Sequence, residues 1–181
     1  GVGFSLVILL ASSVASYMSI QEQTRNRQEL SDTRRSIATV KDVLSALQDA
    51  ETGNRGFQLT GKETYLEPFL WGEKSLPVYV DSVRALASKD PVQKRRLDTL
   101  EAGIDRRMSI IRQHIADKRR GVPLSIAQLD VSKQAMDNCR QIIVRFIQYE
   151  ESQLSVRLTV VDASAKRTSL FLLLSALASI L

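Results

Sequence analysis

Apolar residues recur every three or four positions along most of the chain, which is the spacing of an amphipathic α-helix. No stretch alternates apolar and polar residues for long, as a half-buried strand would. The apolar positions form narrow seams of the kind found in coiled coils and helical bundles. In chain order, the seams are Leu30, Ile37, Val40, Leu44 and Leu47; Leu66, Phe69, Leu76, Val80, Val83 and Ala87; Leu97, Leu100, Ile104, Met108, Ile111 and Ile115; and Leu129, Met136, Cys139, Ile143 and Phe146.

Residues that start or stop helices separate these seams. Gly61 suits the positive φ that often ends a helix. Asp90 can cap a helix that has Pro91 at its first position. Ser125, with Gln128 three residues later, has the pattern of a capping box. These signals predict four helices, over 1–60, 63–88, 91–120 and 125–181.

The predicted fold is therefore all-α, an up-down-up-down four-helix bundle whose first and last helices are much longer than the middle pair. Short loops make neighbouring helices antiparallel. The composition, with 44% hydrophobic and 25% charged residues, is typical of a globular domain rather than a disordered chain.

All charged residues lie in the middle of the chain, since residues 1–20 and 168–181 carry none. About 20 apolar residues in a helix are long enough to cross a bilayer. We therefore expect a transmembrane helix at 1–20, the start of a second, truncated one at 168–181, and a four-helix domain at 21–167 between them. A cleaved signal peptide is the alternative at the first end, and a helix docked on a soluble core is the alternative at the second.

The most specific pattern lies at the end of the first predicted helix, in the segment DAETGNRGFQLTGKETYLEPF from Asp49 to Phe69. It resembles the motif of the CHASE3 family, which are extracytoplasmic sensor domains of bacterial transmembrane signalling proteins. The matching residues include Asp49, Glu51, Thr52, Gly53, Arg55, Gly56, Gly61, Tyr65 and Pro68. The resemblance implies a four-helix bundle between two membrane spans, in agreement with the helices predicted from periodicity.

The motif also places a charge, Glu51, where the apolar seam of the first helix would continue. Glu51 and Arg55 are one helical turn apart, in the order that favours an ion pair. Counted from the two predicted membrane edges, Glu51 and Asp137 lie at the same height. We therefore expect a polar cluster of Glu51, Arg55, Asp137 and Arg140, which either fixes the register of the helices or senses a ligand.

Other patterns that could indicate chemistry are weaker. The segment from Gly56 to Lys62 has most of the spacing of a P-loop, but Glu63 stands where a Ser or Thr would bind magnesium. A single His and a single Cys exclude the usual zinc ligand sets and any intrachain disulfide. We expect His114 to be either solvated or at the edge of the bundle, and Cys139 to be a small core residue.

The net charge of +5 is spread over several basic clusters, Arg106-Arg107 among them, that are mixed with acidic residues. We expect these clusters to be solvated faces, and no nucleic-acid partner, because nucleic-acid binding favours one basic surface. No nucleophile with a general base is recognisable, so no catalytic residue, cofactor or metal site is predicted.

The sequence thus predicts the extracytoplasmic sensor module of a two-span receptor in the bacterial inner membrane, with residues 21–167 periplasmic or extracellular. The resemblance implies a cytoplasmic output, foremost a sensor histidine kinase of a two-component system, with a chemoreceptor or a cyclic-di-nucleotide enzyme as alternatives. The predicted partners are membrane lipid at both ends, a second copy of the chain in a homodimer, and a small molecule of unknown identity. A domain that only dimerises and spaces an output, without a ligand, and a secreted helical protein are the rival hypotheses.

Overall fold

The computed structural model describes residues 2–87 and 90–180, and within these residues the chain forms four long helices and no strand. The helices are α1 (Val2–Thr60), α2 (Glu67–Ala87), α3 (Pro91–Arg119) and α4 (Ile126–Ile180), with a short 3-10 helix, η1 (Glu63–Leu66), before α2. Side chains are described except at 2–9, 160–165, 167–169 and 171–180. The all-α four-helix fold predicted from the sequence is confirmed.

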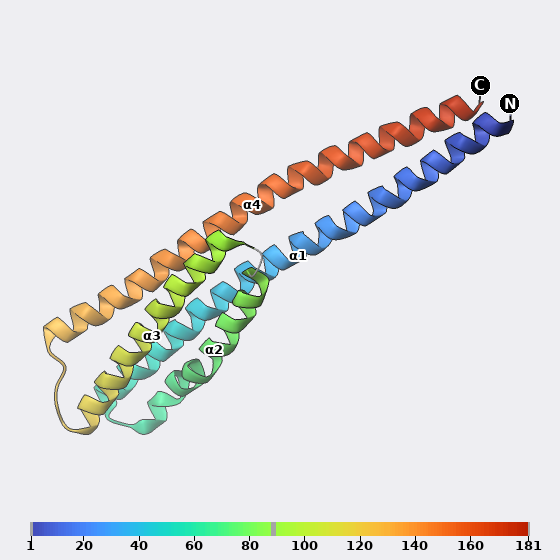
Figure 1. The fold of residues 1–181 in the computed structure, drawn as a ribbon. Coiled ribbons are helices and arrows are strands. Elements are labelled where there is room, and N and C mark those ends of the chain that lie inside the picture. Colours follow the sequence, from blue (N-terminus) through green and yellow to red (C-terminus); the bar gives the residue numbers. More distant parts are fainter. Residues whose placement is uncertain (1, 88–89, 181) are drawn as a thin grey trace. The chain divides into compact units, whose positions relative to one another are not determined.

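The chain divides into two compact units. The bundle unit is Arg34–Glu150, in which parts of α1 and α4 lie side by side with α2 and α3 and consecutive helices run in opposite directions (Figure 1). The terminal unit is Gly1–Thr33 together with Glu151–Leu181, that is, the remaining parts of α1 and α4. The predicted domain at 21–167 therefore includes the whole bundle unit and a part of the terminal unit.

The core of the bundle unit is apolar and receives side chains from all four helices at helical spacing. Its members, each 5% exposed or less, include Val40, Val43, Leu47, Phe69, Leu76, Val83, Leu97, Leu100, Ile104, Met108, Ile111, Met136, Cys139, Ile143 and Phe146. The expectation that Cys139 is a core residue is confirmed. Leu129, which the sequence pattern placed in the same seam, is 51% exposed, because the first turns of α4 border an open groove rather than the core.

The helices end and begin at the capping residues that the sequence analysis predicted. Gly61 has φ 68° after the last residue of α1, and its amide donates to the Phe57 carbonyl at 2.8 Å. Asp90 caps α3 by accepting from the Val92 amide at 2.8 Å. Ser125 and Gln128 form the reciprocal bonds of a capping box at the start of α4. The three cap predictions are confirmed.

In the terminal unit, α1 and α4 are joined by the side chain of Arg157. Its Nη1 donates to Thr33 Oγ1 at 2.9 Å, and its Nε lies 3.9 Å from a carboxylate oxygen of Glu29. Among the described residues, none of the helices contains a stretch long and apolar enough to cross a membrane. The predicted spans at 1–20 and 168–181 include residues that lie outside the described part, and they stay predictions.

Candidate functional site

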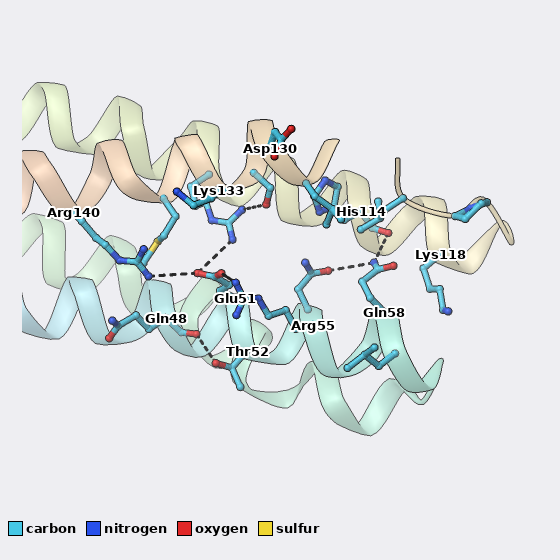
Figure 2. Close-up of a pocket in the computed structure, with 18 residues that line it drawn as sticks. Gln48, Glu51, Thr52, Arg55, Gln58, His114, Lys118, Asp130, Lys133 and Arg140 are labelled. Atoms are coloured by element: carbon cyan, nitrogen blue, oxygen red, sulfur yellow. Dashed lines mark hydrogen bonds and ion pairs between the residues drawn. The ribbon is translucent and has the colours of Figure 1, made fainter. Parts of the chain in front are cut away.

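A cluster of charged side chains lies where α1, α3 and α4 of the bundle unit face one another (Figure 2). At its centre is the Glu51 carboxylate on α1. The Arg55 guanidinium, one turn further along α1, pairs with Glu51 Oε1. Arg140 on α4 approaches from the other side, with its Nη2 3.9 Å from Glu51 Oε2. The structure thus brings Glu51, Arg55 and Arg140 together.

Asp137, the fourth predicted member, lies beside this cluster rather than in it. It accepts from Lys133 Nζ at 2.6 Å and from Arg140 Nη1 at 3.0 Å. The hydrogen bond from Lys133, with help from Arg140, lowers the pKa of the Asp137 carboxyl below its usual range. An ionised Asp137 therefore orients Arg140 toward Glu51 without touching Glu51 itself.

The residue that the sequence reasoning missed is Arg107 on α3. It was expected on a solvated face, but it is only 1% exposed. Its Nη2 lies 3.7 Å from Glu51 Oε2, and its Nη1 donates to Ser132 Oγ at 2.5 Å. Burial lowers the pKa of the Arg107 guanidinium, and Glu51 opposes the shift. Arginine stays protonated in proteins, so Arg107 is a buried cation whose nearest anion is Glu51.

His114 does not have the first of its two expected placements, which was to be solvated. It is 3% exposed rather than solvated, and its Nδ1 has no hydrogen-bond partner among the described residues. Burial lowers its pKa, and the nearby Arg107 charge lowers it further, so the imidazole is neutral at pH 7. The sequence did hold a signal for both residues, because Leu100, Arg107 and His114 recur at steps of seven and so share one face of α3.

A groove of about 950 Å³ lies between α1, α3, α4 and the loop before α4, and it is lined by Glu51, Arg55, Arg107, His114 and Arg140. Beyond the arginines, its wall on α1 continues with amide side chains (Figure 2). Gln58 Nε2 donates to the His114 carbonyl at 2.8 Å and to Asn54 Oδ1 at 3.3 Å. The groove therefore has a cationic end, a polar middle and, at Met136 and Leu129, an apolar wall.

A comparison with protein-family models matches residues 26–159 to the CHASE3 domain. The chain belongs to the CHASE3 family. CHASE3 domains are extracytoplasmic sensor domains of membrane receptors, so this domain has a sensor role. A comparison with curated proteins gives no match. Among solved structures, the chain is similar to the sensor domain of the histidine kinase HK9 of Rhodopseudomonas palustris, with 26% identity, 74% of this chain and 98% of that chain covered, and a TM-score of 0.43.

The motif of this CHASE3 domain has two distinct parts in the structure. Glu51, Thr52 and Arg55 line the groove. Two glycines instead allow η1 and α2 to lie directly against α1. A Cβ atom on Gly53 would meet the Phe69 amide nitrogen at 2.9 Å, and one on Gly56 would meet the Tyr65 ring at 2.6 Å. These positions favour glycine because a side chain would take the space that η1 and α2 occupy against α1.

The remaining motif residues shape the turn from α1 into α2. Gly61 provides the positive φ that ends α1, and Pro68 stands in the first turn of α2, where its missing amide proton is not needed. Asp49 is half-buried on α1, one turn before Gly53. One part of the motif therefore lets η1 and α2 pack against α1. The other part, Glu51, Thr52 and Arg55, lines the groove.

Proposed function

We propose that this CHASE3 domain is the extracytoplasmic sensor of a two-span receptor in the bacterial inner membrane, with a sensor histidine kinase as the foremost output. The single observation that carries the proposal is the family match, which covers residues 26–159. The uncharged ends at 1–20 and 168–181 supply candidates for the two spans. A chemoreceptor tail or a cyclic-di-nucleotide enzyme are the other outputs that fit the same sensor.

The two helices that would cross the membrane also supply the groove. Glu51 and Arg55 belong to α1, and Arg140 belongs to α4. A stimulus that changes the pairing of Glu51 with Arg140 would displace α1 against α4. A coupling of about 1–3 kcal/mol is enough to change an output equilibrium 5- to 150-fold. Packed helices move between discrete arrangements rather than deforming softly, which suits the transmission of such a displacement.

We propose that the receptor acts as a homodimer. The solvent face of α2 carries exposed apolar side chains, with Leu70 58%, Trp71 47% and Val78 60% exposed. Exposed apolar residues grouped on one helix face are typical of interaction surfaces. Light scattering of the purified chain is expected to give twice the mass of one chain, and Trp71→Glu is expected to give the monomer.

Labelling with a membrane-impermeant maleimide tests the topology on whole bacterial cells. Lys62→Cys places a thiol in the exposed turn between α1 and η1. We expect this variant to be labelled without lysis and to stay in the membrane fraction after a carbonate wash. The matched control is the parent chain, whose only thiol, Cys139, is fully buried and is expected to stay unlabelled. Labelling that requires lysis would contradict an extracytoplasmic domain.

A further inference from the structure

The groove carries an excess of positive charge that its own acids do not neutralise. Its basic side chains are Arg55, Arg107, Lys118, Lys133 and Arg140, and its acidic ones are Glu51 and Asp130. The Asp137 carboxylate outside the groove pairs with Lys133 and Arg140. Even so, three guanidinium groups converge on the single carboxylate of Glu51. A concave site with this charge pattern attracts anions.

The donors of this cluster, those of buried Arg107 and of half-exposed Arg140, are only partly used. Arg107 Nη2 and Arg140 Nη2 lie 3.7 and 3.9 Å from Glu51 Oε2, which is too far for a hydrogen bond. Arg107 Nε has no partner among the described residues, although Arg107 is 1% exposed. The Nδ1 atom of buried His114, on the same face of α3, has none either. Buried polar groups are nearly always hydrogen-bonded, so the donor Arg107 Nε indicates a missing acceptor. His114 Nδ1, which donates or accepts depending on the tautomer, indicates a missing polar partner.

We infer that the groove binds a small organic carboxylate, whose oxygens are held by Arg107 and Arg140 beside Glu51. A guanidinium group matches a carboxylate in shape and can donate two parallel hydrogen bonds to it. The anion would bring the arginines closer to neutrality, since all three face Glu51 and only Arg140 also pairs with Asp137. This inference rests on the proposed sensor function, and it names the class of signal that the sensor takes.

The rest of the groove argues for an organic ligand rather than an inorganic anion. A volume of about 950 Å³ is at the upper end for small-molecule sites and far exceeds a bare phosphate ion. Asn54 and Gln58, further along α1, offer amide groups that can bond hydroxyl or carbonyl substituents. Met136 and Leu129 on α4 offer an apolar wall for a carbon skeleton.

The position of the cluster gives the ligand a direct effect on the helices. Arg107 lies on α3 and Arg140 on α4, so a carboxylate held by both would join these helices. Both arginines also lie near Glu51, which belongs to a third helix, α1. The ligand and Glu51 therefore compete for one pair of guanidinium groups, and binding would loosen α1 from α4.

Binding is tested by calorimetric titration of the whole 181-residue chain with acetate, succinate, glutarate, citrate and benzoate. The neutral amides of succinate, glutarate and benzoate, and inorganic phosphate, are the comparison ligands. We expect at least one carboxylate to bind with at least tenfold preference over its amide and over phosphate. The inference is overturned if no carboxylate meets this criterion, or if phosphate binds as tightly as the best carboxylate.

Variants assign the binding to the cluster. Arg140→Gln and Arg107→Gln are each expected to weaken the best carboxylate roughly ten- to hundredfold, because each removes a charge-assisted hydrogen bond. Arg112→Gln is the matched control, since Arg112 is also on α3 but pairs with Glu73 outside the groove. If Arg107→Gln does not fold, the half-exposed Arg140 still decides the question. Unchanged affinity in Arg140→Gln would overturn the assignment, whereas the topology labelling does not depend on any ligand.

Discussion

Neutralising Glu51 is the perturbation whose cost the structure allows us to work out most directly. Glu51→Gln keeps the size of the side chain but removes the anion nearest to Arg107. Arg107 is 1% exposed, so its charge would stay buried with only the Ser132 hydroxyl as a partner. Removing one member of a buried ion pair costs about 3–5 kcal/mol. Because the 3.7 Å separation is longer than a hydrogen bond, we expect the lower end, about 3 kcal/mol of unfolding free energy.

The complementary change is Arg107→Met, which removes the buried charge and keeps an unbranched chain of similar volume. Glu51 would keep its pairs with Arg55 and Arg140, so this change leaves no uncompensated buried charge. We therefore expect Arg107→Met to cost clearly less than Glu51→Gln, about 1 kcal/mol. In the double variant, Glu51→Gln no longer leaves a buried cation behind. The double variant is therefore expected to be more stable than the sum of the single changes by about 1.5 kcal/mol or more.

Denaturant unfolding of the whole chain, followed by far-ultraviolet circular dichroism, measures all four members of this cycle. Arg55→Gln is the control, because the Arg55 side chain is 74% exposed and its ion pair with Glu51 is worth about 0.5 kcal/mol or less. The reasoning is refuted if Glu51→Gln costs no more than Arg55→Gln, or if the two changes of the cycle are simply additive.

Three further predictions concern the motif and the titratable groups of the bundle unit. Gly53→Ala is expected to destabilise the chain by about 2–3 kcal/mol, because its Cβ would meet the backbone of η1 and α2. Gly121→Ala meets no neighbouring atom and is expected to cost only the strain of its positive φ, about 1 kcal/mol. Equal losses of stability in thermal melts would contradict this. Asp90→Ala is expected to lose the α3 cap and the Tyr149 hydrogen bond, about 1–2 kcal/mol. Burial raises the pKa of the Asp90 carboxyl, but hydrogen bonds from Tyr149, Val92 and Gln93 outweigh burial and leave this pKa lowered in the folded chain. The contribution of Asp90 to stability is therefore present above the unfolded pKa of 3.8 and is lost as the pH falls through the lower folded pKa. An Asp90→Ala variant with the same loss of stability in acid as the parent would contradict this. His114 has a pKa below 6.5 in the folded chain, so as the pH falls the unfolded chain binds a proton at this residue first. The free energy of unfolding is therefore expected to decrease as the pH drops below 6.5, and His114→Gln is expected to remove this decrease. Parallel profiles of unfolding free energy against pH for parent and variant would contradict a buried neutral imidazole.

The fold could be predicted from the sequence because its helices begin and end at residues whose chemistry is local. Gly61, Asp90 and the Ser125–Gln128 pair act within one turn of the chain, so their effect does not depend on tertiary structure. The height of Glu51 relative to Arg140 was also predictable, since the rise of a helix is constant and both helices can be counted from their uncharged ends.

The groove could not be predicted in the same way, because it depends on which polar residues the neighbouring helices bury. For the third helix, periodicity assigned only apolar residues to the seam. Arg107 was therefore expected on a solvated face, although Arg107 and His114 follow Leu100 at steps of seven. Leu129 was expected in the core for the opposite reason, since the pattern cannot show that α4 borders a groove at that height. A charged residue is buried only where partners such as Glu51 and Ser132 receive it, which is a tertiary property.

We propose that the cluster of Glu51, Arg55, Arg107 and Arg140 controls how α1 and α4 lie toward each other. Spin labels at Arg27→Cys and Val156→Cys, both exposed positions of the terminal unit, allow pulsed electron paramagnetic resonance to measure the distance between these helices while the buried Cys139 stays in place. The account predicts that Glu51→Gln shifts or broadens the distance distribution and that Arg112→Gln leaves it unchanged. Identical distributions in the parent chain and in folded Glu51→Gln would contradict it.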